Sequence, residues 1–230
     1  MTARSFGKAV ALDDLARTDH PHLTAADQCW CLARYVSGPG YRAGQVNQLI
    51  ANLKCAPSIA AADPARAGHK RRAIEEAAIA VRRAVSSGWA ESVTWIPIPP
   101  SYPPGDRNYD DRLMRVLRVA FASDDADVRS LLYQVRTEPA DHLRVRRLSV
   151  DRLYESVRVN VAALACRPVR ASIVLFDDVL TTGKHYKCCE RRLLQVLPHV
   201  PVSGLFLARR ALSARGRRLP RQPYQRALGR

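Results

Sequence analysis

Negative charge is scarce in this sequence. The 230 residues include 37 lysines and arginines but only 21 aspartates and glutamates, which gives a formal net charge of +16 at pH 7. A surface with this excess attracts anions, such as phosphorylated metabolites, nucleic acid or an acidic partner. No helix-turn-helix or zinc-finger signature accompanies the charge, so the charge alone does not assign a nucleic-acid function.

The sequence also lacks the cysteine spacing of a zinc module. Its six cysteines form no Cys-x2-Cys pair and no Cys/His cluster: Cys29, Cys31, Cys55, Cys166, Cys188 and Cys189. Most of them fall within apolar patterns, which favours reduced thiols packed in a core over a disulfide framework. We therefore expect no metal site built from cysteine side chains.

Long apolar runs and internal repeats are absent as well. The N-terminal region carries Asp13, Asp14 and Arg17 inside any candidate apolar segment, which argues against a secretory signal peptide. No other stretch is apolar over the length of a membrane span. The sequence therefore predicts a cytoplasmic protein without a membrane partner.

The length suits one α/β domain with an added element. Residues 1–88 are predicted to form an N-terminal helical section that precedes any strand. A Thr-x-x-Asp sequence at Thr24 to Asp27 resembles a capping box and predicts a helix to about Tyr35. Further helices are predicted from about Gly44 to Lys54, and from an Asp63–Pro64 start to about Ser87, ended by Gly88.

Residues 89–212 are predicted to form the α/β core. We expect strands at Val93–Ile98, Leu131–Val135, about residues 173–179 and Pro201–Ala208, with helices between them. The helix after the first strand is predicted to begin near Arg107 and to end near Phe121, and another is predicted at about 150–157. Strands that alternate with helices in this way form a parallel sheet through right-handed crossovers.

Residues 213–230 form a basic tail. This segment holds six arginines, two prolines and no acidic residue, which predicts disorder. The composition also leaves open that the tail binds nucleic acid.

One stretch, from Ser172 to His185, combines three chemical features. A short apolar run is followed by Asp177 and Asp178, then by Thr181-Thr182-Gly183, and then by apolar residues at helical spacing. Unpaired N–H groups at a helix start suit a phosphate, and glycine permits close approach of the backbone. Carboxylates at the carboxyl end of a strand can accept hydrogen bonds from a vicinal diol. We expect both carboxylates to lie at a solvent-facing strand end, and a ribose 5-phosphate would satisfy both parts of the stretch.

This stretch resembles the diphosphoribosyl-binding signature of the type I phosphoribosyltransferases. Four apolar residues, two acids, an apolar residue, any residue, two Thr/Ser and Gly match from Ile173 to Gly183. His185 departs from the pattern, because the family usually has Thr or Ser there. Two rival motifs fail: Val179 replaces the second acid of a haloacid-dehalogenase motif, and a Walker A loop needs a second glycine.

Weaker similarity to the ComF-like branch of this family extends over about residues 93–210. The prolines after the first strand and Arg107 match a Pro-x-Pro and basic-loop pattern that binds pyrophosphate in the family. Leu148, Ser149 and, one residue early, Arg152 match a later motif, although Glu155 replaces its Asn. The polar, basic segment 136–149 stands where the family has a mobile hood over the active site.

The resemblance implies an α/β fold whose parallel-sheet, Rossmann-like core is of the phosphoribosyltransferase type. It also implies a glycosyltransferase of nucleotide metabolism that binds 5-phosphoribosyl 1-diphosphate with Mg²⁺ and passes the phosphoribosyl group to an unidentified acceptor, releasing pyrophosphate. Asp177 and Asp178 are the implied catalytic residues, which hold the ribose hydroxyls. The implied substrate-binding residues are Val179, Leu180, Thr181, Thr182, Gly183, Lys184 and His185 around the 5-phosphate, and Pro99, Pro100, Ser101 and Arg107 near the diphosphate.

An alternative function is a non-catalytic sensor of phosphoribosyl diphosphate or a nucleotide that acts as a nucleic-acid-associated regulator. The positive charge and the arginine tail favour this alternative. The acceptor and the oligomeric state are left open, with a dimer as one option.

Overall fold

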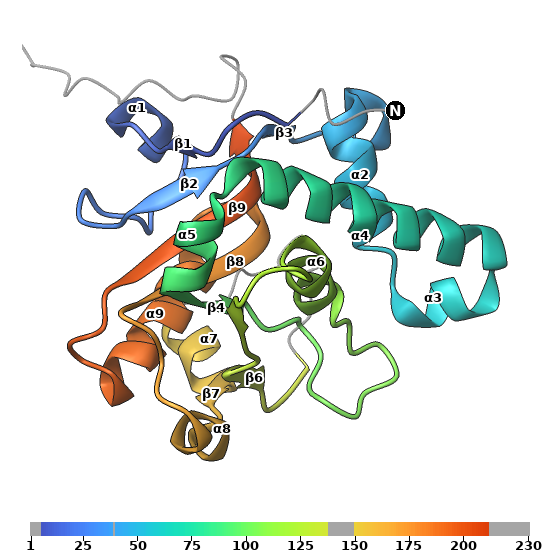
Figure 1. Ribbon diagram of the computed structural model, residues 1–230. Coiled ribbons are helices and arrows are strands. Elements are labelled where there is room, and N and C mark those ends of the chain that lie inside the picture. The colour runs from blue at the N-terminus through green and yellow to red at the C-terminus, as the bar shows by residue number, and fades with distance from the viewer. Residues whose placement is uncertain (1–5, 39, 138–149, 212–230) are drawn as a thin grey trace, which may run out of the picture.

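The central strand β8 (Ser172–Leu180) is apolar on both sides because helices cover both faces of its sheet. The computed structural model describes residues 6–38, 40–137 and 150–211. Val174 and Phe176 pack into one core with the helices α2 (Gln45–Leu53), α4 (Pro64–Ala84) and α6 (Arg112–Ala120). Ile173 and Leu175 pack into a second core with α7 (Val150–Ser156) and α9 (Lys184–Val196), and all four side chains are fully buried. The protein therefore has three layers, with the sheet between two sets of helices (Figure 1).

The sheet is mostly parallel. Strand β8 lies between β4 (Val93–Pro97) and β9 (Val202–Ala211), and β5 (Asp127–Val128) extends the sheet beyond β4. All of these neighbours run parallel, as the alternation of strands and helices predicts. The predicted α/β class, with mostly parallel strands flanked by helices, is thus confirmed, and the arrangement is compatible with a Rossmann-like core.

Beyond β9, residues of the N-terminal section complete the sheet. Both β2 (Cys29–Cys31) and β3 (Arg34–Val36) pair in parallel with β9, and β1 (Val10–Ala11) pairs antiparallel with β2. The predicted helix from Thr24 to Tyr35 is therefore wrong, and the N-terminal section is not purely helical.

The capping-box residues of this region do interact, but no helix follows them. The Asp27 carboxylate accepts hydrogen bonds from the backbone N–H and the hydroxyl of Thr24. Its other oxygen binds the Lys187 ammonium at 2.6 Å. Cys29, Trp30 and Cys31 then extend along β9, because their pairing partner lies far away in the sequence and overrides the local helix signal.

Local signals predict most of the remaining helices well. Helix α2 (Gln45–Leu53) forms as expected, and α4 (Pro64–Ala84) begins where the Asp63 carboxylate accepts the N–H groups of Ala65 and Arg66. Helix α4 ends earlier than predicted, and Gly88 lies inside the separate helix α5 (Ser87–Ser92). Helix α9 (Lys184–Val196) follows β8, and α7 (Val150–Ser156) forms close to its predicted bounds.

Two expectations between β4 and β8 need correction. The residues from Arg107 to Asp111 are not helical, and α6 (Arg112–Ala120) begins only after them. The strand expected at Leu131–Val135 exists as β6 (Leu132–Gln134), but it pairs antiparallel with β7 (Val157–Val159) in a separate two-stranded sheet. The parallel neighbour of β4 is instead the two-residue strand β5, which is too short to leave a periodic pattern in the sequence.

The remaining elements are short. They are α1 (Asp14–Arg17), a 3-10 helix (Gly40–Ala43), α3 (Pro57–Ala62) and α8 (Val161–Cys166). Four cysteines are buried as expected, whereas Cys55 is partly exposed and Cys166 is exposed. The tail and most of the predicted hood, residues 138–149, lie outside the described residues.

Candidate functional site

The main candidate site is a pocket of about 340 Å³ at the carboxyl ends of β4 and β8. After β4 the chain returns through α6 to β5 on one side, whereas after β8 it returns through α9 to β9 on the other side. Ligands of open α/β sheets bind in the crevice at such a change of direction. The topology therefore points to this pocket independently of any motif.

Most of the predicted site residues meet in this pocket. Those that line it are Pro99, Pro100 and Ser101 after β4, and Asp177, Asp178, Val179, Leu180, Thr181, Thr182, Gly183, Lys184 and His185 after the apolar part of β8. Arg107 is exposed and is not among the lining residues. The structure thus brings together two loops that are more than seventy residues apart in the sequence.

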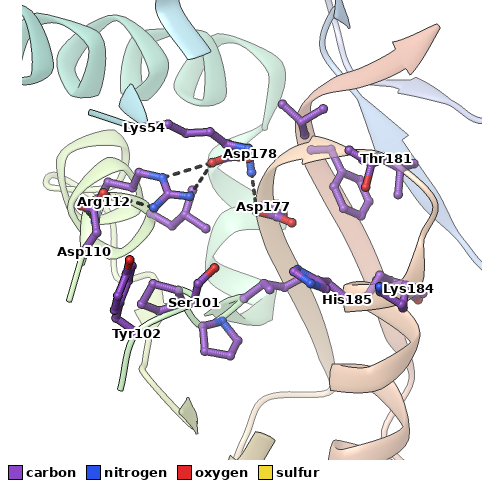
Figure 2. Close-up of a pocket in the computed structure, with 18 of the residues that line it drawn as sticks. Lys54, Ser101, Tyr102, Asp110, Arg112, Asp177, Asp178, Thr181, Lys184 and His185 are labelled. Atoms are coloured by element: carbon purple, nitrogen blue, oxygen red, sulfur yellow. Dashed lines mark hydrogen bonds and ion pairs between the residues drawn. The ribbon is translucent and has the colours of Figure 1, made fainter. Parts of the chain in front are cut away.

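The two carboxylates do not share one environment. The Asp178 side chain is only 3% exposed, and its Oδ2 accepts hydrogen bonds from Arg112 Nη2 at 2.7 Å and Nε at 3.1 Å. Its Oδ1 lies 2.9 Å from Lys54 Nζ (Figure 2). The expectation that both carboxylates face solvent is therefore wrong for Asp178, because two cations from α6 and from the end of α2 enclose it.

Asp177 lies at the centre of the pocket. Figure 2 shows it between Lys54 and Arg112 on one side and Thr181, Lys184 and His185 on the other. Its Oδ1 accepts the backbone N–H of Asp178 at 2.8 Å. Asp177 is thus the more exposed member of the acidic pair in the pocket.

The unequal surroundings separate the pKa values of the pair. Burial and the neighbouring Asp178 charge raise the pKa of Asp177 from 3.8 to about 7. Although burial opposes it, Lys54 and Arg112 together hold the pKa of Asp178 well below its ordinary value. The pair therefore carries one fixed negative charge on Asp178 and one proton-sensitive carboxyl on Asp177.

A chain of charges extends from Asp178 into the core. Arg112 Nη1 also lies 3.2 Å from Asp110 Oδ2, which Lys70 Nζ approaches at 2.7 Å. The Lys70 ammonium donates further hydrogen bonds to the carbonyls of Leu53 and Cys55. These residues join α4, α6 and the end of α2 to the site, so the N-terminal section forms one wall of the pocket.

The turn after the acidic pair has the backbone geometry expected for anion binding. Gly183 adopts φ +82° and is the N-cap of α9. The N–H groups of the first turn of α9 lie at the positive end of the helix dipole. This arrangement can hold a phosphate beside Thr181 and Thr182.

Gly183 takes the unusual backbone dihedral expected of it, and a neighbouring side chain adds a second reason for glycine at this position. A Cβ atom there would lie 2.7 Å from Leu23 Cγ, so the open side of Gly183 faces the N-terminal segment. His20 Nδ1 lies 2.5 Å from the Thr181 carbonyl oxygen, and the His22 N–H donates to the Thr182 carbonyl at 3.0 Å. Glycine is required by its positive φ and by Leu23, and residues 20–23 hold the turn from behind.

Sequence reasoning missed these supporting residues. Lys54, Lys70, Asp110 and Leu23 carry no local signal, because their roles depend on contacts between distant parts of the chain. Arg112 had a weak signal, since it stands at the start of a strongly amphipathic helix whose next residues are buried. A cation that is buried at the start of a helix needs an acidic partner nearby.

The donor set suits a magnesium ion that is carried mainly by substrate phosphates. Among the described residues no cluster of three or more His, Cys, Asp or Glu side chains could cage a metal ion. Asp177 supplies one carboxylate at the pocket, and Mg²⁺ in phosphate sites commonly uses one or two carboxylates together with phosphate oxygens and water. The pocket therefore fits an Mg²⁺ ion that is bound mainly by the phosphate groups of the substrate and by Asp177.

A comparison with protein-family models, with curated proteins and with solved structures finds no match to this chain. The function must therefore be argued from the geometry of the pocket and from the resemblance of the stretch 173–183. In the described ranges no helix is both long and apolar enough to cross a membrane.

Proposed function

We propose that the pocket binds 5-phosphoribosyl 1-diphosphate, and that the protein is a phosphoribosyltransferase-type enzyme that passes the phosphoribosyl group to an acceptor. The observation that carries this proposal is the order of groups at the switch point of the sheet. A partly buried carboxylate, Asp177, is followed by a Thr-Thr-Gly turn that opens helix α9. The ligand has the matching order of a vicinal diol and a 5-phosphate.

Each part of the site has a role in this proposal. The N–H groups from Gly183 onward and the Thr181 and Thr182 hydroxyls bind the 5-phosphate. Ionised Asp177 accepts hydrogen bonds from the ribose hydroxyls and so fixes the orientation of the ring. Asp178 stays ionised and holds Arg112 and Lys54 at the pocket wall.

In the proposed reaction, an acceptor nucleophile bonds to the anomeric carbon while the bond from that carbon to pyrophosphate breaks. The electron pair of the broken bond leaves with pyrophosphate. Protein groups hold the ring and stabilise the charges that develop, so no protein nucleophile is needed. Bound Mg²⁺ would neutralise part of the diphosphate charge. Ser101 and the prolines before it lie on the β4 side of the pocket, where the diphosphate would lie.

Two measurements test the proposal. Calorimetry with 5-phosphoribosyl 1-diphosphate and Mg²⁺ measures binding, and a pyrophosphate-release assay against a panel of bases and amines measures turnover. We expect saturable binding that Asp177→Asn weakens at least tenfold, and release that depends on one class of acceptor. Binding without release for any acceptor would favour the sensor alternative, and absence of binding would overturn the proposal.

A further inference from the structure

The charged residues beside the pocket are not equivalent in exposure. Four of them form a buried set that alternates in sign: Lys70, Asp110, Arg112 and Asp178. Their side chains are between 3% and 16% exposed, and the two positive charges balance the two negative charges. This set is therefore neutral without any further partner.

Lys54 is not one of the four residues whose charges balance. Its side chain is 45% exposed, and its ammonium adds one positive charge to an Asp178 carboxylate that already accepts two hydrogen bonds from Arg112. Leu53, the preceding residue, is completely buried and fixes the backbone at this position. Lys54 is thus anchored at its base, while its charged end lies in the wall of the pocket.

Lys54, Asp177 and the turn at Thr181 to Gly183 follow one another across the pocket. In Figure 2 Lys54 lies on one side of Asp177, and Thr181 and Lys184 lie on the other. The pocket thus offers a cation, a carboxylate and an anion-binding turn in sequence. A ligand with anionic groups at both ends and hydroxyls between them complements this order.

We infer that Lys54 is a binding residue for the anionic group at the far end of the ligand from the phosphate turn. The inference rests on the proposed function, in which that group is the diphosphate. When the ligand enters, the Lys54 ammonium donates a charge-assisted hydrogen bond to a diphosphate oxygen. Asp178 remains paired with Arg112, so the release of Lys54 from Asp178 leaves no buried charge uncompensated. The N-terminal section thereby contributes directly to ligand recognition.

The test compares three ligands on three variants at pH 8.5, where Asp177 is ionised. The ligands are ribose 5-phosphate, inorganic pyrophosphate with Mg²⁺, and 5-phosphoribosyl 1-diphosphate with Mg²⁺. The variants are Lys54→Met, Lys54→Arg and Lys8→Met. The last removes the same charge from an exposed position that does not line the pocket.

For Lys54→Met we expect Kd for both pyrophosphate-containing ligands to rise about tenfold or more, the usual effect of losing a hydrogen bond to a charged group. Its Kd for ribose 5-phosphate should stay within about twofold of the parent value. Lys54→Arg should restore most of the affinity for the diphosphate ligands, and Lys8→Met should bind all three as the parent does. Thermal unfolding of each variant checks that the fold is retained.

Two results would overturn the inference alone. The first is an unchanged affinity of Lys54→Met for the diphosphate ligands. The second is an equal loss for all three ligands, which would mean that Lys54 acts only by organising Asp178. If the parent protein binds none of the three ligands, the proposed function itself fails, and this inference falls with it.

Discussion

Asp177 and Asp178 are neighbours in one strand, yet the protein uses them in opposite ways. Asp178 is enclosed by Arg112 and Lys54, whereas Asp177, within the described part of the chain, accepts a hydrogen bond from the Asp178 N–H alone and lines the pocket. A buried carboxylate with two cationic partners is held as an anion, and a second carboxylate beside it is disfavoured as an anion. The pair therefore divides into a buried, ion-paired acid and an acid that is open to the pocket.

This division predicts different outcomes for two similar substitutions. Asp178→Asn removes the carboxylate that Arg112 and Lys54 share, which leaves the buried set with an excess positive charge, and should lower the free energy of unfolding by about 3–5 kcal/mol. At pH 5, where the carboxyl of Asp177 is protonated, Asp177→Asn should change stability much less, and at higher pH it should weaken binding of 5-phosphoribosyl 1-diphosphate. Urea denaturation and calorimetry measure the two effects.

A control for the loss of charge is available on the surface. Asp125 is 93% exposed and pairs with Arg170, so Asp125→Asn should cost less than about 1 kcal/mol. A loss for Asp178→Asn as small as that of Asp125→Asn would show that the buried set is not a structural unit.

The raised pKa of Asp177 predicts a pH effect with a definite sign. The folded state holds this proton up to about pH 7, whereas the unfolded chain releases it near pH 4. Because the folded state binds more protons in this window, the contribution of Asp177 to stability is present below about pH 4 and is lost as pH rises to about 7. Asp178, with its lowered pKa, contributes in the opposite sense only at more acidic pH.

Chemical denaturation at pH 5, 6, 7 and 8 should show this effect as a difference between the parent and Asp177→Asn. The parent should lose stability relative to the variant as pH rises to 7 and should then reach a plateau. Ligand binding should improve over the same range, since the ionised carboxylate is the better acceptor for hydroxyls. A constant difference in stability across the series would refute the raised pKa.

At the scale of the elements, the turn between β8 and α9 depends on residues that precede the core. Gly183 has a positive φ, and its open side is in contact with Leu23. Gly183→Ala should therefore lower stability through two separate effects, strain of the left-handed backbone and overlap with Leu23. Gly105 also has a positive φ, +91°, but no heavy atom lies within 4 Å of its Cβ position, so Gly105→Ala measures strain alone.

A double-mutant cycle separates the two effects. We expect Gly183→Ala to cost more than Gly105→Ala, and to cost less in a Leu23→Ala background because the overlap is then relieved. The free energies of unfolding of the four cycle members provide the measurement. Strict additivity of the two substitutions would mean that Leu23 does not constrain the turn.

The elements also show what local sequence can and cannot predict. Helix α4 begins at the Asp63 cap, α2 and α9 begin directly after glycines, and all three have amphipathic patterns, so their signals lie within a few residues. Strand β2 exists because β9 lies beside it, and residues 24–27 alone favour a helix start. The two-residue strand β5 has no periodicity to detect.

The same difference between local and long-range signals applies to the residues of the site. The acidic pair and the turn could be predicted because they form one continuous stretch. Lys54 and Arg112 could not be placed beside Asp178, because their approach depends on how α2 and α6 pack on the sheet. The nucleic-acid role of the tail stays a prediction, because residues 213–230 lie outside the described ranges.

At the scale of the whole molecule, the N-terminal section and the core share one sheet. Because β2 and β3 pair with β9, a chain that starts at residue 89 would expose the backbone edge of β9 and the apolar side chains beneath α4. We expect this truncated chain to be unfolded or aggregated. A chain of residues 1–211, which keeps every strand that the structure describes, should fold. Circular dichroism and thermal unfolding of the two chains provide the comparison, and a cooperative transition in the first would refute the expectation.

The pairing of Cys29 with Gly204 also constrains the order of events during synthesis. Strand β2 leaves the ribosome well before its parallel partner, which follows about 175 residues later, on the order of ten seconds or more at ordinary translation rates. Until then the nascent chain must keep an unpaired strand and its apolar side chains from associating with other molecules. Newly made copies should therefore depend on chaperones until β9 has emerged, and a pause in translation just before β9 should lower the yield of folded protein.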